Sequence, residues 1–346
     1  MKYYDKLIFI QAAADLQHAL HLYDSNKNEI VKLCVINVKS VYEYLISLPL
    51  TNVTIVFYPY VTFNIKNPLS YIKAKRELKN IWNKDFKNDK PTKVYFFSRF
   101  YDWFTMSIVV NFIKLNHIKV IYYDHYDDLS IKNDLLINYL TLNGLRLKLR
   151  AFIHSYISAA NFNAHHQIRN LEFDYKKYNI KKVTPYDKII ISSDYLYKNN
   201  IGDKKEVLFF LSPGELEMLH DNSKLILKNI ILSLKKQGFY LTLKGHPRLG
   251  NPEEFVPLFN NVIPNSVPSE FICYSQTIMA VGIISTALNF VTTKDNIKII
   301  SLIKIVSFKD ENKKNFYLNY LNELSKSKID FVDNISHFGI NDYISK

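Results

Sequence analysis

The sequence predicts an α/β protein made of two Rossmann-like domains that face each other across a cleft. Short apolar runs alternate with helical segments from the start, which is the pattern of parallel strands joined by helices. A polar stretch near Ser192–Lys205 interrupts the alternation, which then begins again. The length of 346 residues also fits two domains of about 150 residues each. We therefore expect domains over 1–195 and 196–330, with 331–346 as a segment that is a candidate to pack back on the first domain.

The first half supplies five apolar runs that predict strands, with helical segments between them. KLIFIQA leads into a helix at Asp15–Asn26, and KLCVINV leads into a helix at Val41–Leu48. NVTIVFYPY precedes the basic amphipathic segment Lys66–Trp82, whose charges are typical of a solvated helix face. KVYFFS, a helix at Tyr101–Asn116 and KVIYYD follow, and the spacing predicts a long helical region from Asn133 to Lys176.

The second half repeats the rhythm of the first. VLFF predicts a strand, SKLILKNIILSLKK predicts a helix that Gly238 ends, and FYLTL predicts the next strand. After a Pro-bearing stretch that reaches Pro264, the runs IMAVGIIS and KIISLI predict two more strands around the helix-like TALNFVTTK. Ligands of open parallel sheets bind beyond the carboxyl ends of the strands, and the candidate motifs all fall there.

Composition excludes several classes of protein. Hydrophobic residues make up 48% and charged residues 22% of the chain, which with 25 Tyr and 23 Phe excludes a disordered chain. Cys34 and Cys273 lie in apolar runs, so neither a disulfide scaffold nor a zinc site is expected. The apolar stretch near the amino terminus, flanked by Asp5 and Asp15, covers half of the ~20 residues that a membrane span needs. We expect no signal peptide or transmembrane helix, and a cytoplasmic location.

The net charge indicates a polyanionic partner. The 45 Lys and Arg exceed the 32 Asp and Glu by 13. Nucleic acid, an anionic membrane surface or a phosphorylated ligand would each fit that excess.

The most specific motif is the loop Lys244-Gly245-His246-Pro247-Arg248, which follows a predicted strand. Gly and Pro favour a turn, and the turn brings a lysine, an imidazole and a guanidinium together. Such a cluster suits a phosphate, because the imidazole donates a hydrogen bond while the cations supply charge. The alternative is an exposed basic turn with a structural histidine.

A second motif is the hydroxyl pair Ser285 and Thr286, between a predicted strand and a helix-like segment. Ser285 has the character of a helix N-cap, and a helix amino terminus with free N–H groups favours anions. A plain N-cap without a ligand is the alternative.

The polar cluster Asp124–Ser130 follows the last strand predicted in the first half. Adjacent carboxylates raise one another's pKa, which favours a general base. An Asx-rich turn that caps a following helix is an equal alternative, and a divalent metal is conceivable although no further acidic ladder accompanies the cluster.

Weaker candidates are two short loops and a histidine pair. The carboxylate in Pro268-Ser269-Glu270 could bind ribose hydroxyls, or it could belong to an ordinary helix start. Ser212-Pro213-Gly214-Glu215 has the same two interpretations. His165 and His166 lie in a predicted helical, Asn-rich stretch without further ligands, so we expect them on the surface.

Four of these segments together resemble a known family: KGHPR, IISTAL, IPNSVPSEF and YDDLS are similar to the motifs of the bacterial sialyltransferases of the GT-B kind. That group includes glycosyltransferase families 80 and 52 and, more distantly, the bacterial polysialyltransferases. The family has a D/E-D/E-G motif in the amino-terminal domain, and an HP and an S-S/T motif in the carboxy-terminal one. The motifs cover a small part of the chain, but their joint occurrence in this order is more specific than any one of them.

The resemblance implies an inverting, metal-independent transfer of a sialic acid or related nonulosonic acid from a CMP-activated donor to a hydroxyl of an acceptor glycan. It implies that His246, Ser285 and Thr286 bind the CMP phosphate, that His246 is also catalytic because it assists departure of the nucleotide, and that Glu270 holds the ribose. Asp128, or else Asp127, would deprotonate the acceptor. Leu129 stands where the family has glycine, which leaves the choice between these two aspartates open. The donor-binding candidates are Gly214, Lys244, Gly245, His246, Pro247, Ser269, Glu270, Ser285 and Thr286.

Other functions stay open at this point. A GT-B glycosyltransferase that uses CMP-Kdo or a UDP-sugar has similar requirements. A nucleic-acid-binding protein would account for the charge, although the charges are dispersed along helices and no nucleic-acid motif is present. A membrane adaptor would leave the HP and S-T loops unexplained. The dispersed charge favours peripheral association with the anionic inner membrane, where lipid-linked precursors of a lipooligosaccharide or capsule would lie.

Overall fold

The chain divides into two compact units, Met1–Ile191 and Ser192–Lys346. The computed structural model describes residues 2–64, 67–98, 102–115, 117–125, 142–165, 170–185, 189, 191–199, 201–294, 296–326 and 328–333. Each unit carries its own sheet and its own hydrophobic core.

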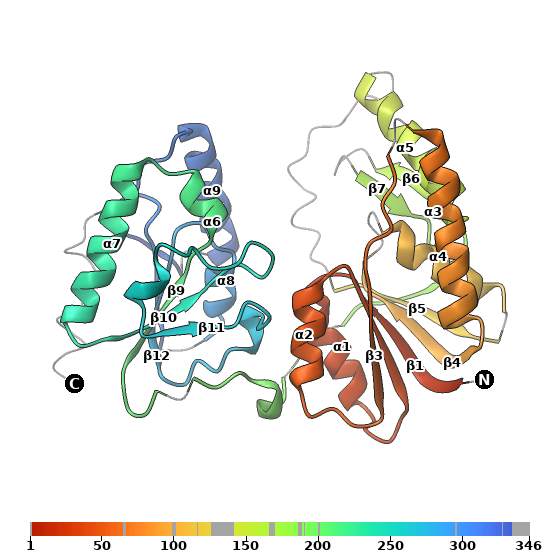
Figure 1. Ribbon diagram of the computed structural model, residues 1–346, viewed down its shortest axis with the longest axis horizontal. Helices are drawn as coiled ribbons and strands as arrows, with labels where there is room; N and C mark the ends of the chain where they lie inside the picture. The colour runs from red at the N-terminus through yellow and green to blue at the C-terminus, as the bar shows by residue number, and fades with distance from the viewer. Residues whose placement is uncertain are drawn as a thin grey trace. The chain divides into compact units, whose positions relative to one another are not determined.

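A six-stranded parallel sheet forms the centre of the first unit (Figure 1). Its strands lie in the order β3-β2-β1-β4-β5-β8, which is the strand order of a Rossmann sheet. The strands are β1 (Lys2–Ile10), β2 (Val31–Ile36), β3 (Val53–Tyr58), β4 (Asp89–Phe96), β5 (Lys119–Tyr123) and β8 (Lys181–Val183). The central ones are almost continuously apolar, because helices cover both faces of a parallel sheet.

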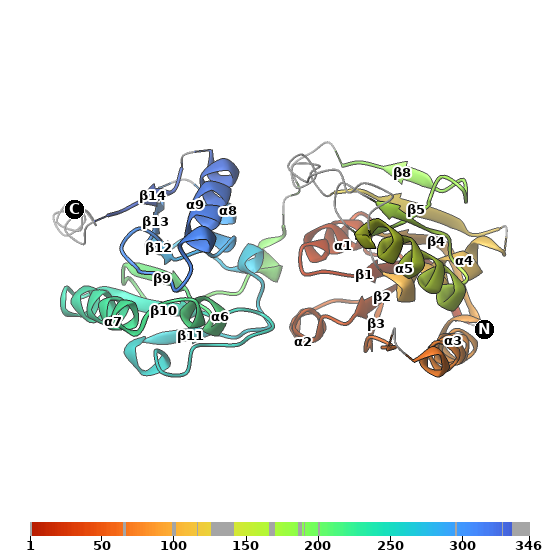
Figure 2. The same ribbon diagram turned by 90° about the horizontal axis from the view of Figure 1, so that it is seen from above.

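Helices cover both faces of this sheet (Figures 1 and 2). One face packs against α3 (Pro68–Ile81), α4 (Trp103–Ile113) and α5 (Leu142–Ser158), and the other against α1 (Asp15–Asp24) and α2 (Lys39–Ser47). The predicted helix over Lys66–Trp82 begins at the N-cap Asn67, whose side chain accepts a hydrogen bond from the N–H of Leu69, and it continues as a π-helical turn, η1 (Trp82–Phe86).

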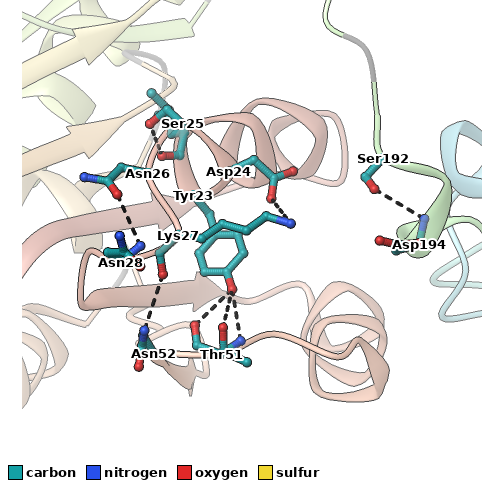
Figure 3. A network of polar contacts seen from close by, with 11 residues as sticks. Tyr23, Asp24, Ser25, Asn26, Lys27, Asn28, Thr51, Asn52, Ser192 and Asp194 are labelled. Carbon is teal, nitrogen blue, oxygen red and sulfur yellow. Dashed lines mark hydrogen bonds and ion pairs between the residues drawn. The ribbon is translucent and has the colours of Figure 1, made fainter.

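A tyrosine joins the end of α1 to the start of β3 (Figure 3). The Tyr23 hydroxyl donates to the carbonyl of Thr51 at 2.9 Å and accepts from its N–H at 2.9 Å. Asn52 donates from its side chain to the carbonyl of Lys27 at 3.3 Å. These contacts fix where β3 enters the sheet, since its first residue follows directly.

The prediction of one helical region over Asn133–Lys176 is wrong for its second part. Helix α5 ends at Ser158, and Ala159 takes the left-handed conformation at φ 56°. An antiparallel pair follows, β6 (Phe162–His165) and β7 (Asn170–Phe173). The physical reason is that Phe162, Leu171 and Phe173 are all buried in the core beside α5. His165 therefore belongs to a strand, and His166 lies outside the described residues.

The second unit repeats the topology of the first (Figure 2). Its sheet has the order β11-β10-β9-β12-β13-β14, built from β9 (Glu206–Phe210), β10 (Tyr240–Lys244), β11 (Asn261–Ile263), β12 (Thr277–Gly282), β13 (Lys298–Ser301) and β14 (Asp330–Phe331). All its pairs are parallel. The predicted α/β class with two Rossmann-like domains is therefore confirmed, and two such units in one chain are the architecture of the GT-B fold.

The described residues of the second unit also form four helices and three 3-10 turns. They are α6 (Pro213–Glu217), α7 (Asp221–Lys236), α8 (Ala287–Val291), α9 (Glu311–Ser325), η3 (Ser193–Tyr195), η4 (Val256–Leu258) and η5 (Ser269–Phe271). α6 and α7 bury their apolar sides in the main core of this unit, and α8 packs on β12 and β13.

The polar stretch expected as a linker belongs largely to the second unit. Tyr197 pairs with Ile272 in a parallel bridge, and Tyr195 and Ile201 are buried. At the other end, Phe331 is part of β14 and Val332 enters the core of this unit. Residues 334–346, expected to pack back on the first domain, lie outside the described residues.

A buried carboxylate fixes the register of the central strand of the second sheet. Glu206, 1% exposed, begins β9 and accepts hydrogen bonds from the hydroxyls of Thr242 on β10 and Thr277 on β12. The side chain of Asn199 donates to the same carboxylate. The three strands thus start in register, which sets where their carboxyl ends lie.

The buried imidazole of His154 predicts acid sensitivity of the first unit. His154 is 1% exposed among aromatic rings, and burial, with a smaller contribution from Arg150, lowers its pKa from 6.5 to about 4. The unfolded chain therefore takes up a proton that the folded chain refuses as the pH falls through this window. We expect this histidine to lower the free energy of unfolding by up to about 1.4 kcal/mol per pH unit as the pH falls from 6.5 to about 4.

Urea unfolding at several pH values measures this slope. His154→Phe should flatten it, while the exposed His220→Phe should leave it unchanged. Equal slopes for wild type and His154→Phe would show that folding does not lower the pKa of His154.

Candidate functional site

The carboxyl edge of the second sheet brings together the loops that carry most of the predicted donor-binding residues. The strand order reverses between β9 and β12, and this is the point at which open α/β sheets bind ligands. The short loop Leu211–Ser212 and the first turn of α6 follow β9, and the loop Ile283–Thr286 follows β12. The histidine turn follows β10, which lies beside β9.

Glu215 joins the two loops at this reversal point. Its carboxylate accepts from the N–H of Ser212 at 2.9 Å and from the N–H of Ile284 at 3.3 Å. The Ser212 hydroxyl accepts from the N–H of Glu215 in return, which completes a capping box at the start of α6. Glu215 is 7% exposed, and burial raises its pKa from 4.5 to about 7. The capping interpretation of this motif is thus confirmed, and the same side chain also connects two loops.

The histidine motif is a tight turn that fixes the tautomer of its imidazole. The backbone of His246 pairs with that of Gly250 in both directions, at 3.0 and 2.9 Å. Nδ1 of His246 accepts from the N–H of Arg248 at 3.1 Å and of Leu249 at 3.2 Å. Nδ1 therefore carries no proton, and the proton of the neutral ring is on Nε2. Partial burial, together with the charges of Lys244 and Arg248, lowers the pKa of His246, so the exposed ring is a neutral N–H donor near pH 7.

Two glycines allow this turn to lie against its neighbours. A Cβ on Gly245 would lie 2.6 Å from the carbonyl oxygen of Gly250 and would also strike the side chain of Asn251. A Cβ on Gly214 would lie 3.0 Å from Leu249, which places α6 against the histidine turn. Pro247 follows the histidine and is half-buried.

Lys244 lies under the turn rather than on its surface. It is 3% exposed, and its ammonium donates to the carbonyl of Gly245 at 2.7 Å. Burial lowers its pKa to about 8, although the nearby carboxylate of Glu270 raises it. At neutral pH the side chain is therefore a buried cation, which acts through its field rather than as an exposed hydrogen-bond donor.

Glu270 lies on the short turn η5 and couples electrostatically to Lys244. The Ser269 hydroxyl donates to its carboxylate at 3.1 Å, and the Tyr274 hydroxyl donates to the carbonyl of Ser269 at 2.8 Å. η5 also contacts α8, the helix that follows the hydroxyl pair. The ribose-binding candidate Glu270 is thus close enough to affect Lys244 electrostatically, and its turn contacts the helix that follows the hydroxyl pair.

The hydroxyl pair differs from its predicted form by one residue. The N-cap of α8 is Thr286 rather than Ser285, and Thr286 makes no side-chain capping bond. The Ser285 hydroxyl instead accepts from the N–H of Ala287 at 3.4 Å. The chain stays in the helical conformation at Thr286, with φ −65°, so the residue that caps with its side chain is the one before it. Thr286 is exposed and Ser285 half-buried.

The predicted general bases Asp127 and Asp128, with Leu129, lie outside the described residues. The described start of that cluster is Asp124, whose carboxylate forms an ion pair with Lys182 at 2.6 Å.

Sequence reasoning missed a buried polar cluster at the carboxyl edge of the first sheet. Asp15, 0% exposed, accepts from the N–H groups of Gln11 and Ala12, and its other oxygen lies 2.8 Å from Nε2 of His125. The imidazole of His125 stacks on His18 with ring centroids 4.0 Å apart. The only signal in the sequence is that Asp15 and His125 each follow the end of a strand. The two residues are 110 positions apart in the chain, so no local pattern connects them.

The described part of the chain meets neither the requirements of a metal site nor those of a membrane-spanning helix. It holds no group of three or more His, Cys, Asp or Glu side chains placed to bind a metal ion. None of its helices has the length and apolar run needed to cross a bilayer.

Comparison with known proteins gives similarity to solved structures alone. No protein-family model and no curated protein sequence matches the chain. The glycotransferase of kitacinnamycin is 12% identical over 97% of this chain and 88% of its own, with a TM-score of 0.45. The UDP-GlcNAc 2-epimerase from Methanocaldococcus jannaschii is 12% identical over 100% and 92%, with a TM-score of 0.46. The UDP-GlcNAc 2-epimerase from Neisseria meningitidis, bound to UDP-GlcNAc, is 10% identical over 100% of both chains, with a TM-score of 0.41.

The carboxyl group of Glu215 should titrate near neutral pH. Because burial raises its pKa to about 7, it should hold its proton far above the range of an exposed glutamate. NMR of the chain labelled with ¹³C at glutamate carboxyl carbons measures this directly. One resonance should titrate near pH 7 in wild type and be absent from Glu215→Gln.

The control is Glu217→Gln, which changes an exposed glutamate of the same helix and should leave that resonance in place. If all glutamate resonances titrate below pH 5.5, the carboxylate between the loops is ionised and the expectation is wrong.

Proposed function

We propose that the chain is an inverting glycosyltransferase that moves a sialic acid, or a related nonulosonic acid, from a CMP-activated donor to a hydroxyl of an acceptor glycan. The observation that carries the proposal is the set of donors along one edge of the second sheet. His246 offers Nε2–H, and Ser285 and Thr286 offer hydroxyls. Neutral donors at the reversal point of a Rossmann sheet suit the phosphate of a nucleotide.

In the proposed reaction each group of the donor site acts on the leaving nucleotide. His246 donates from Nε2 to a phosphate oxygen of CMP, and the hydroxyls of Ser285 and Thr286 donate to the same group. Glu270 accepts from the ribose hydroxyls. The buried ammonium of Lys244 adds a positive field as negative charge grows on the phosphate.

The acceptor step is proposed for the first unit. Asp128 takes the proton from the acceptor hydroxyl, and the acceptor oxygen forms a bond to the anomeric carbon. The bond between that carbon and the phosphate oxygen breaks at the same time, and CMP leaves with the electron pair. Because one displacement occurs, the configuration inverts. We propose that no metal takes part, since the protein's own donors balance the charge of the leaving group.

The acceptor that we propose is a bacterial surface glycan, a lipooligosaccharide or capsule precursor. Such acceptors are linked to lipid, so we also propose a cytoplasmic protein that associates peripherally with the inner face of the membrane.

The direct test is a transfer assay with CMP-Neu5Ac, galactoside acceptors and EDTA, with products identified by mass. We expect transfer at full rate in EDTA, and a fall of ~10²-fold or more in Asp128→Ala, as loss of a general base produces. Loss of activity in Asp127→Ala alone would reassign the base to Asp127. Transfer from UDP-sugars but not from CMP-Neu5Ac would overturn the proposal.

Two substitutions of His246 separate phosphate binding from the fold of the turn. Asparagine places an oxygen where Nδ1 accepts from Arg248 and Leu249, but it offers nothing at Nε2. Glutamine reaches the Nε2 position but lacks the acceptor at Nδ1. We expect His246→Asn to keep the thermal stability of wild type and to weaken CMP binding by ~10-fold, as loss of a hydrogen bond to a charged group does.

Isothermal titration with CMP and UMP, alongside thermal unfolding, gives both quantities. His246→Gln should show the converse: a less stable turn, with part of the CMP affinity kept. CMP affinity equal to wild type in His246→Asn would remove the imidazole from the donor site.

A further inference from the structure

The outer side of helices α3 and α5 carries an unusual set of exposed apolar side chains. The two helices lie against each other on one face of the first sheet (Figures 1 and 2). Six large apolar residues on them are 42–74% exposed: Leu69, Ile72, Leu145, Leu149, Phe152 and Tyr156. We call this surface the α3–α5 face. Each of these side chains exposes apolar surface to water. This exposure does not stabilise the folded chain, so an apolar patch of this kind marks an interaction site.

The α5 residues of the face form one continuous row. Leu145, Leu149, Phe152 and Tyr156 are spaced by four, three and four residues, so they project from the same side of the helix. The opposite side of α5 is occupied, because Leu147, Ala151 and Ile157 lie in the core. The exposed row is thus a second apolar side on a helix that already has its core contacts.

The charges around the row are almost all positive. α3 carries Lys73, Lys75, Arg76 and Lys79 against one acid, Glu77, and α5 carries Arg146, Lys148 and Arg150 with no acid. An open groove of about 600 Å³ on α3 is lined by Leu69, Ile72, Lys73, Arg76, Glu77 and Asn80, so two cations and one acid border its apolar residues. The ammonium of Lys75 lies 4.0 Å from the centre of the Tyr156 ring, which ties the two helices together at the face.

This combination selects an occupant. An exposed apolar row on a helix, flanked by long basic side chains, matches the interface of a bilayer that contains anionic lipids. The apolar groups enter among the acyl chains while the cations meet the headgroup phosphates. We propose that the α3–α5 face docks the protein on an anionic phospholipid surface. The inference rests on the proposed function only for its purpose, which is to bring the chain to lipid-linked acceptors.

Vesicle sedimentation tests the docking without any sugar nucleotide. Vesicles of phosphatidylcholine alone should bind wild type weakly, and vesicles that also contain phosphatidylglycerol should bind it strongly at low salt. Leu149→Ser combined with Phe152→Ser should weaken the second binding about tenfold or more, and so should Lys73→Gln combined with Arg76→Gln.

Matched controls come from exposed residues of the second unit. Leu225 and Phe316 are 60% and 63% exposed, close to the 56% and 70% of Leu149 and Phe152, so Leu225→Ser with Phe316→Ser should bind vesicles like wild type. Lys236→Gln with Lys313→Gln is the matching control for charge, since both lysines are exposed. An equal loss of vesicle binding in the control variants would mean that net charge or non-specific hydrophobic adsorption causes the binding, and the proposal would fail.

Fluorescence distinguishes insertion from loose adhesion. Phe152→Trp should be quenched by lipids brominated on the acyl chains, whereas Phe316→Trp should not. Vesicle binding that ignores phosphatidylglycerol content would overturn the proposal. So would a change of oligomeric state in Leu149→Ser with Phe152→Ser, seen by light scattering, with vesicle binding unaltered, because the face would then be a protein interface.

The outcome is independent of the donor site. All the face variants should bind CMP like wild type, because none of the substituted residues belongs to the second unit's carboxyl edge. A chain that binds anionic vesicles but not CMP would support the docking proposal and contradict only the proposed function.

Discussion

The carboxyl edge of the second sheet, which we propose as the donor edge, depends on one carboxyl group. Glu215 accepts a hydrogen bond from the N–H of Ser212 behind β9 and from the N–H of Ile284 behind β12, so it fixes the two loops that flank the reversal of strand order. Without it, two backbone N–H groups would be buried unpaired, at a cost of about 1–3 kcal/mol each. Burial raises its pKa to about 7. The group can therefore hold the loops without placing a full negative charge at the edge where we propose that a phosphate binds.

The other contacts of this edge follow the same principle, in which backbone groups and neutral donors define the geometry. Glu206 sets the strands in register from the opposite end, and the turn after β10 fixes the imidazole of His246 through two backbone N–H groups. Gly245 is required because any side chain there would meet the carbonyl of Gly250. An imidazole held in this way loses little freedom on binding, so its hydrogen bond to a ligand costs less entropy than one from a mobile side chain.

Most strands of the two sheets, the two-unit organisation and the position of the motifs at strand ends could be predicted from sequence, because they depend on periodicity and on short-range turn chemistry. The short strands β8, β11 and β14 were not predicted. The capping box at Ser212 is local in the same sense. What could not be predicted depends on distant partners. The stretch after Ser158 forms two strands because Phe162 and Phe173 are buried under α5, and Asp15 finds His125 across 110 residues. Lys244 was expected to join His246 and Arg248 in a phosphate-binding turn. Its inward position is set by the carbonyl of Gly245 and by burial beneath the turn, neither of which leaves a pattern in the sequence.

Two groups of basic residues contribute to the excess of 13 positive charges in physically different ways. At the donor edge Lys244 is buried and acts at low effective dielectric, where salt screens little, and His246 acts as a neutral donor. On the α3–α5 face the cations are mostly exposed, and their attraction to an anionic surface falls off within about 10 Å at 0.1 M salt. The first group is small and oriented, and its lysine is buried, which suits the single phosphate that we propose as its ligand. The second group is larger and mostly exposed, which suits the deformable anionic surface that we propose. The apolar row on α5 would then supply the part of the binding that salt does not remove.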